Sequence, residues 1–181
     1  MVQFASHLRP GGQSADRNPS EQFIQLWMAP VVGNINGKMS GKRLFDARIT
    51  VVPEGEPFAI SLSAIQSGLA GAAKEATAGA IEFRPAQTRV ARLGVIAEAV
   101  SRPGAYFSTS LLDQTSRQTR ILFYVDRRCV IHGSISDHVV DLTVARPGLH
   151  WVELPHDAGG RPLPSRLADS QQGAVVVDVT M

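Results

Sequence analysis

The sequence lacks the means to form an intrachain disulfide bond, because Cys129 is the only cysteine among 181 residues. It also lacks any run of about 18 consecutive apolar residues, the length that a membrane-spanning helix needs. Charged residues make up 19% of the chain and aromatic residues only 6%, whereas hydrophobic residues reach 44%. A chain of this length and composition can bury a core without covalent staples, so we expect a globular protein without a membrane span, stabilised by packing.

Lysine is also scarce, and the basic residues that are present do not cluster. Lys and Arg together number 18 against 16 acidic residues, and only three of the 18 are lysines (Lys38, Lys42 and Lys74). Nucleic-acid binders usually carry a basic face, so the scattered arginines disfavour nucleic acid as a partner. The excess of Arg, with many Ala and Val residues, is typical of GC-rich bacterial coding, which explains it without invoking a function.

The N-terminal segment is polar and rich in Gly, Pro, Ser and Arg. It has no hydrophobic run behind a basic start, so it does not read as a secretory signal. We expect a flexible arm over residues 1–21 and a single domain over residues 22–181. The location stays open: cytoplasmic if the chain is native and complete, periplasmic or secreted if a signal peptide was removed.

Alternation of apolar and polar residues with a period of two dominates the rest of the chain. It is clearest over residues 58–64, and residues 105–112 and 119–126 read as a hairpin around a polar loop. Residues 66–80 break the alternation, so at most one short helix is expected near 66–79. Many short strands joined by turn signals predict an all-β fold, namely an antiparallel β-sandwich, or a jelly-roll or barrel-like variant, of about nine strands. We expect the apolar final segment, residues 173–180, to lie inside a sheet.

Four of the five histidines lie between residues 132 and 156 and are interleaved with acidic residues. Imidazole and carboxylate groups are ligands for zinc, iron and manganese, and neighbouring antiparallel strands can bring such groups together. No pair shows a recognised ligand spacing, so scattered surface histidines are the competing interpretation. The alternative function is therefore a small metal-dependent enzyme or metal-binding protein that holds one transition metal ion, such as zinc, with His132, His138, His150 and His156.

The sequence contains no recognisable catalytic motif. It has neither the Gly-x-Ser-x-Gly turn of α/β-hydrolases nor a phosphate-binding loop. Cys129 and His132 are three residues apart on one expected strand, so their side chains point to opposite faces and do not form a nucleophile–base pair. We therefore assign no catalytic residue, and we expect Cys129 to be a small buried hydrophobic residue without a redox or metal cofactor.

The long Pro- and Gly-rich loop over residues 155–172 is the place where we expect a binding surface, because long loops in compact domains are often functional. Aromatic, histidine and arginine side chains near this loop and near the second hairpin are the candidate contacts. The favoured function is a non-enzymatic binding or assembly module that acts through a protein partner or through self-association. The candidate binding residues are His150, Trp151, His156, Arg127 and Arg128.

Overall fold

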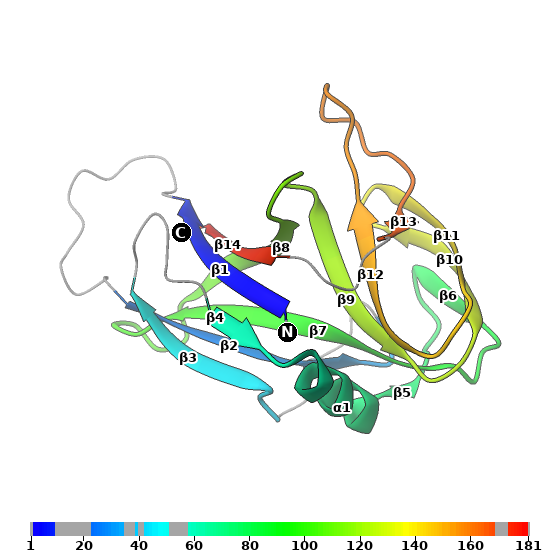
Figure 1. Ribbon diagram of the computed structural model, residues 1–181, viewed down its shortest axis with the longest axis horizontal. Helices are drawn as coiled ribbons and strands as arrows, with labels where there is room; N and C mark the ends of the chain where they lie inside the picture. The colour runs from blue at the N-terminus through cyan, green and yellow to red at the C-terminus, as the bar shows by residue number, and fades with distance from the viewer. Residues whose placement is uncertain are drawn as a thin grey trace.

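The computed structural model describes residues 2–9, 23–34, 39, 42–50, 58–168 and 174–180, which form two β-sheets and one helix (Figure 1). The larger sheet has 11 strands and the smaller sheet has three. In the larger sheet the strands are β1 (Val2–Arg9), β2 (Phe23–Val32), β3 (Phe45–Thr50), β4 (Phe58–Ile60), β5 (Lys74–Glu75), β7 (Arg89–Ala99), β8 (Tyr106–Asp113), β9 (Thr119–Val125), β12 (Gly148–Leu154), β13 (Arg166–Leu167) and β14 (Ala174–Thr180). The smaller sheet contains β6 (Ile81–Arg84), β10 (Cys129–Ile135) and β11 (His138–Val144).

The order of the larger sheet is β13-β12-β9-β7-β8-β14-β1-β4, with β2 and β5 also paired to β7 and with β3 paired to β2. The smaller sheet has the order β11-β10-β6. Apart from the parallel pair β1–β14, the strand pairs within the described residues are antiparallel. The predicted all-β, sandwich-like fold is therefore confirmed, although the strand segments outnumber the nine that were expected because several, such as β5 and β13, are only two residues long.

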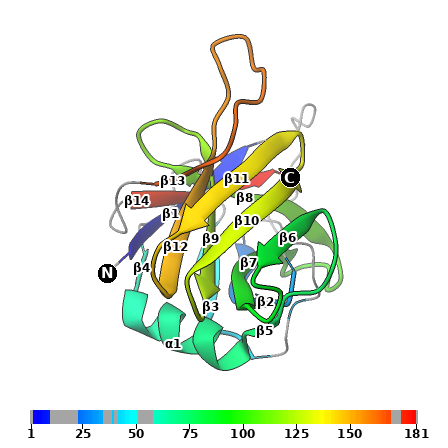
Figure 2. The ribbon, with the colours of Figure 1, turned by 90° about the vertical axis from the view of Figure 1, so that its right-hand side faces the viewer.

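Apolar side chains cover both faces of the centre of the larger sheet. On one face the smaller sheet packs over Phe123, Val125 and Val152 (Figure 2). On the opposite face Leu122 and Trp151 join the cluster that contains the buried residues of the helix. Alternate residues of β9 thus enter two different apolar layers, which explains why this strand is apolar almost throughout.

The only helix of the described residues is α1 (Leu62–Ala72), which buries Ile65 and Leu69. The strand predicted over residues 58–64 is wrong beyond Ile60, because Ser61 caps the helix: its side chain accepts a hydrogen bond from the backbone N–H of Ala64 at 3.4 Å. The single short helix expected near 66–79 exists, but it begins and ends earlier. Among the residues that the structure describes, no helix is long and apolar enough to cross a membrane.

The final strand lies inside the larger sheet, as predicted, since β14 pairs with β8 on one side and with β1 on the other. Strand β1 was not expected, because its residues fall within the segment 1–21 that we predicted to be an arm. Met1 and residues 10–21 of that region lie outside the described residues, so the division into an arm and one domain stays a prediction. Asn36-Gly37, a pair typical of hairpin turns, and residues 53–57, which contain two prolines and a glycine, also lie outside them.

The predicted hairpin of β8 and β9 is present, but its two strands diverge almost at once. They pair with each other only at Leu112 and Thr119. Strand β7 lies between them: its residues 90–92 pair with β9, and its residues 97 and 98 pair with β8. The three strands therefore enclose an opening in the sheet.

Gly133 holds β10 against β6, and its substitution tests that contact. Its φ is +132°, and an added Cβ would collide with the backbone oxygen of Ala80. Gly148 has a similar φ of +122° but open space around its Cα. We expect Gly148→Ala to destabilise the protein by about 1–3 kcal/mol through backbone strain. Gly133→Ala should cost roughly 1–3 kcal/mol more because of the collision. Urea denaturation measures both, and equal losses would contradict a rigid contact with Ala80.

Candidate functional site

The most prominent surface feature is the segment Pro155–Leu163, called the finger below. It leaves the end of β12 and projects away from the sheets before the chain returns to β13 (Figures 1 and 2). Residues 156–161 are all exposed. Within residues 155–168, the described part of the predicted loop 155–172, the finger reaches furthest into solvent. Its internal structure therefore decides whether it can act as a recognition element.

The tip of the finger is organised by Asp157. Its carboxylate oxygen Oδ1 accepts hydrogen bonds from the backbone N–H groups of Gly159 and Arg161, each at 2.9 Å. Its backbone carbonyl accepts from Gly160 at 3.0 Å, and its own N–H donates to the carbonyl of Arg161 at 3.0 Å. Gly160 adopts a φ of +78°, which glycine tolerates at little cost. The sequence Asp-Ala-Gly-Gly-Arg therefore encodes a closed turn rather than an open loop.

The base of the finger is fixed from two sides. Leu163 donates its backbone N–H to the carbonyl of Pro155 at 2.9 Å, which closes the two arms of the finger. The backbone N–H of His156 donates to the side-chain oxygen of Gln118 at 2.9 Å, which ties the finger to the start of β9. Because each arm has a partner, the finger has a defined position relative to the larger sheet.

His138 forms the second anchor, on the smaller sheet. Its side chain is buried, and its Nδ1 donates to the carbonyl oxygen of Leu163 at 2.9 Å. This bond requires the proton on Nδ1. The ring of His138 also meets the ring of His156 edge-on, with 4.7 Å between centroids and 86° between planes. Two of the four predicted metal-ligating histidines are therefore neighbours, and one of them holds the finger in place.

The other two histidines lie apart from this pair. His132 is on the outward face of β10, with its Nδ1 3.2 Å from a carboxylate oxygen of Asp141. His150 donates from Nε2 to the carbonyl of Arg146 at 2.9 Å, and burial lowers the pKa of its imidazole. Among the residues that the structure describes, no three His, Cys, Asp or Glu side chains are arranged to hold a metal ion. The four-histidine ligand set is therefore not assembled among these residues. Strand alternation places His132 and His138 on opposite faces of the smaller sheet, and His150 lies on the larger sheet with its ring beside Phe123.

The remaining candidate binding residues do not form one surface. Trp151 is only 2% exposed, and its ring packs in the core beside α1. Arg127 and Arg128 are exposed, but they follow β9, whereas the finger is tied to the residue before β9. Arg127 is also paired with Asp126 at 3.0 Å. Of the predicted binding residues, His156 is the one that the structure places in the finger.

Cys129 is buried, as expected for a packed residue rather than a nucleophile. Burial raises the pKa of its thiol to about 11, and the nearby Asp126 carboxylate adds to the shift. The thiol is therefore protonated at neutral pH and poorly reactive. His132, three residues along β10, lies partly exposed on the other face, so the two groups are separated by the strand itself.

A partly buried ion network joins the strands beneath the finger. Glu153 accepts from Nε and Nη2 of Arg120, the former at 3.0 Å, and from Nε of Arg166 at 2.8 Å. Arg120 also pairs with Asp113 at 3.0 Å. The side chains of Arg120 and Glu153 are only 12% and 9% exposed. Because each member of the network has a partner, its role is to hold β8, β9, β12 and β13 together.

Sequence analysis missed this network, although one signal was present. Arg120 and Glu153 stand at positions whose neighbours two residues along, Leu122 and Trp151, point into the core. A charged residue at such a position needs a partner, and the β9–β12 register places the two opposite each other. That register is not readable from the sequence alone, because the two strands are separated by the whole of the smaller sheet's β10–β11 hairpin.

The anchoring role of His138 predicts a local effect on the finger. We expect His138→Ala to speed amide hydrogen exchange at Gly160, Arg161 and Leu163 by roughly 5–150-fold, because about 1–3 kcal/mol of anchoring is lost. Residue-resolved hydrogen exchange by NMR measures it. His132→Ala is the matched control on the same sheet, and it should leave the finger unchanged. Unchanged exchange in His138→Ala would refute the anchor.

The ion network predicts a pH dependence of stability. Burial opposes ionisation of Glu153, but Arg120 and Arg166 outweigh it and hold the pKa of the carboxyl below its ordinary value. A lowered folded-state pKa contributes stability above the unfolded pKa, and this contribution disappears as pH falls through the folded pKa. Glu153→Gln should therefore lower the free energy of unfolding by about 3–5 kcal/mol at pH 7. Because the variant lacks the ionisable group, its free energy of unfolding should fall less steeply than that of the native protein between neutral and acidic pH.

Urea titrations at several pH values provide the test, with Glu82→Gln as control. Glu82 is also on a strand and lies near an arginine, but 62% of its side chain is exposed. Its replacement should change stability by no more than about 0.5 kcal/mol. Parallel pH curves for the native protein and Glu153→Gln would contradict the assigned role of Glu153.

Comparison with known proteins supplies no relative. No protein-family model matches the chain, and neither a curated protein nor a solved structure is detectably similar to it. Its function is therefore argued from the finger and the sheet that carries it.

Proposed function

We propose that the protein is a non-enzymatic binding or assembly module that contacts another protein chain through the finger. The observation that carries the proposal is the combination of exposure and internal order in residues 156–161. An ordered loop loses less conformational entropy on binding than a flexible one, so its contacts yield more net affinity. Rigid projections of this kind suit recognition rather than catalysis, which needs reactive groups that the finger does not bring together.

The length of the finger also favours a binding role. Strands β12 and β13 are antiparallel neighbours, paired at Glu153 and Arg166. Antiparallel neighbours need a connection of only two to five residues. The chain instead runs out and back over residues 154–165, and most of these residues add nothing to the apolar core. The extra length therefore has no evident structural purpose within the protein.

The surface chemistry of the finger suits a protein partner. Its base presents apolar surface, since Leu163 is 39% exposed and the adjoining Val139 is 60% exposed. The tip presents Arg161, while the carboxylate of Asp157 is engaged by the turn. Apolar contact combined with arginine is typical of protein interfaces. One arginine at the tip supports neither a nucleic acid nor a membrane surface as the partner.

Site-specific photo-cross-linking tests the proposal. A photoreactive amino acid replaces Ala158 at the tip or, as the control, Ala145, which is also exposed and lies shortly before β12. We expect Ala158 to give discrete adducts with another protein in source cells, or a cross-linked dimer in the purified protein if the partner is a second copy. Sedimentation velocity then distinguishes self-association from binding to a different chain.

The order of the finger should matter as well as its position. We expect Asp157→Ala to reduce the yield of the Ala158 adduct by about tenfold, because a loosened turn loses more conformational entropy when it binds. The proposal would be refuted if the tip gave no adduct in either setting, or if Ala145 gave the same adducts with equal yield.

A further inference from the structure

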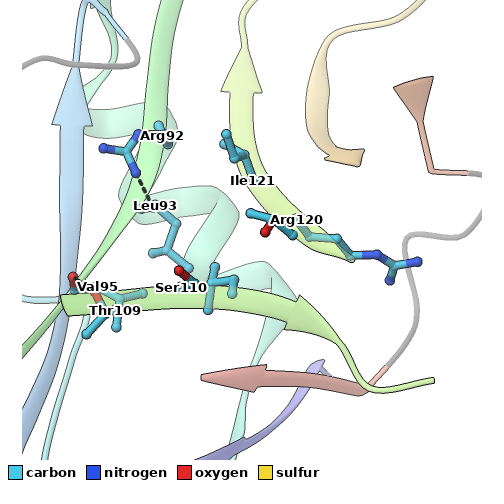
Figure 3. A pocket seen from close by; sticks show the side chains of 9 residues that line it. Arg92, Leu93, Val95, Thr109, Ser110, Arg120 and Ile121 are labelled. Carbon is cyan, nitrogen blue, oxygen red and sulfur yellow. Dashed lines mark hydrogen bonds between the residues drawn. The ribbon is translucent and has the colours of Figure 1, made fainter. Parts of the chain in front are cut away.

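The opening between β7, β8 and β9 forms a small cavity of about 160 Å³ (Figure 3). It lies within the sheet itself, where the three strands separate, and it is distinct from the finger. Its lining is contributed by all three strands and includes hydroxyl side chains and backbone. The lining residues are Arg92, Leu93, Val95, Thr109, Ser110, Leu111, Thr119, Arg120 and Ile121.

Backbone polar groups ring this cavity. Residues 93–96 of β7 pair with β2 along one edge, but with neither β8 nor β9 along the other. Residues 109–111 of β8 and 120–122 of β9 likewise pair only with their outer neighbours, β14 and β12. Since alternate residues of a strand direct both N–H and C=O to the same edge, each of the three strands presents donors and acceptors to the opening.

The side chains at the rim add neutral polar groups. Thr109 donates from Oγ1 to the carbonyl of Val95 at 2.8 Å, which joins two sides of the opening. Ser110 and Thr119 supply two further hydroxyl groups. The guanidinium of Arg120 points away from the opening, toward its partners in the ion network (Figure 3). No acidic residue is among the nine that line the cavity. The guanidinium of Arg92 is turned to its own strand, where it donates to the carbonyl oxygen of Leu93 at 3.5 Å (Figure 3). The interior is therefore polar, and the charges of both lining arginines are directed to protein groups.

Such a cavity calls for a polar occupant. Backbone N–H and C=O groups that are withdrawn from bulk water are almost always hydrogen-bonded, to protein, water or ligand. An apolar molecule would offer these groups no hydrogen bonds, and a carboxylate would meet carbonyl oxygens that repel it. A molecule that carries donors and acceptors side by side satisfies both kinds of group at once.

We propose that this opening is a binding site for a small neutral molecule with adjacent hydrogen-bond donors and acceptors, namely a primary amide or a polyol. A cavity of about 150 Å³ accommodates a molecule of benzene's size, so the ligand, or the part of it that enters, has about six non-hydrogen atoms. Ordered water is the competing occupant, because a polar cavity of this size also holds several waters.

Titration of ¹⁵N-labelled protein with propionamide and glycerol tests the proposal by NMR. We expect saturable shifts of the amide signals of Leu93, Val95, Thr109 and Leu111, with affinities in the millimolar range that suits ligands this small. Propionate, an anion of the same shape as propionamide, and benzene should bind at least about tenfold more weakly. Saturable binding of propionamide or glycerol at these signals supports the site.

Paired serine variants identify the cavity as the place of binding. Ser110→Val removes a hydroxyl and fills the rim, so we expect at least a tenfold loss of affinity. Ser108→Val, two residues earlier on the same face of β8 and outside the lining, should bind as the native protein does. If Ser110→Val does not fold, Thr119→Val replaces it.

Three results would overturn the proposal. The first is the absence of saturable shifts with both propionamide and glycerol, which would assign the cavity to water. The second is equal or tighter binding of propionate, which would make it an anion site. The third is equal affinity in Ser110→Val, or in Thr119→Val if that variant is used, and in Ser108→Val, which would place the binding elsewhere.

Discussion

The ion pairs of Glu153 are the interaction on which the rest of the architecture depends. Its bond to Arg166 joins the two strands between which the finger leaves and returns. Its bonds to Arg120, which also pairs with Asp113, hold the narrow end of the opening where β8 and β9 meet. One carboxylate and its arginines therefore fix the geometry of both candidate binding features. Removing charges from water is costly, and this cost offsets part of the stability that the ion pairs contribute.

The sheet around this network works as a rigid platform because its centre is buried on both faces. β9 and β12 send alternate side chains into the layer beneath the smaller sheet and into the layer beside α1. Strands held in this way have little freedom to close the gap beside β7. The opening persists because Gly94 and its neighbours on β7 are paired along the β2 edge, while β8 is held by β14. The pairing of β7 with β2 and of β8 with β14 thus maintains the polar opening between β7, β8 and β9.

Local patterns predicted the fold class well, and they predicted the site only in part. Alternation placed β8 and β9 within one residue of their observed bounds, Tyr106–Asp113 and Thr119–Val125. It failed beyond Ile60, where the alternating pattern continues through Leu62 although Ser61 caps the helix and the helix buries Ile65 and Leu69. His156 and the loop that carries it could be singled out from the sequence. The burial of Trp151, the ion network and the opening could not, because each depends on which strands become neighbours across long stretches of chain.

The parallel pairing of β1 with β14 has a consequence for how the protein is made. β14 fills the place between β8 and β1, so the larger sheet is interrupted until residues 174–180 have been synthesised. Until then β1 has only the short strand β4 beside it, and the facing edge of β8 stays uncovered. A nascent chain therefore carries the open edge of β1 from early in translation, and the open edge of β8 from the synthesis of residues 106–113 until that of β14. Open edges of this kind invite pairing with other chains. The sheet becomes continuous only when its first and last strands meet.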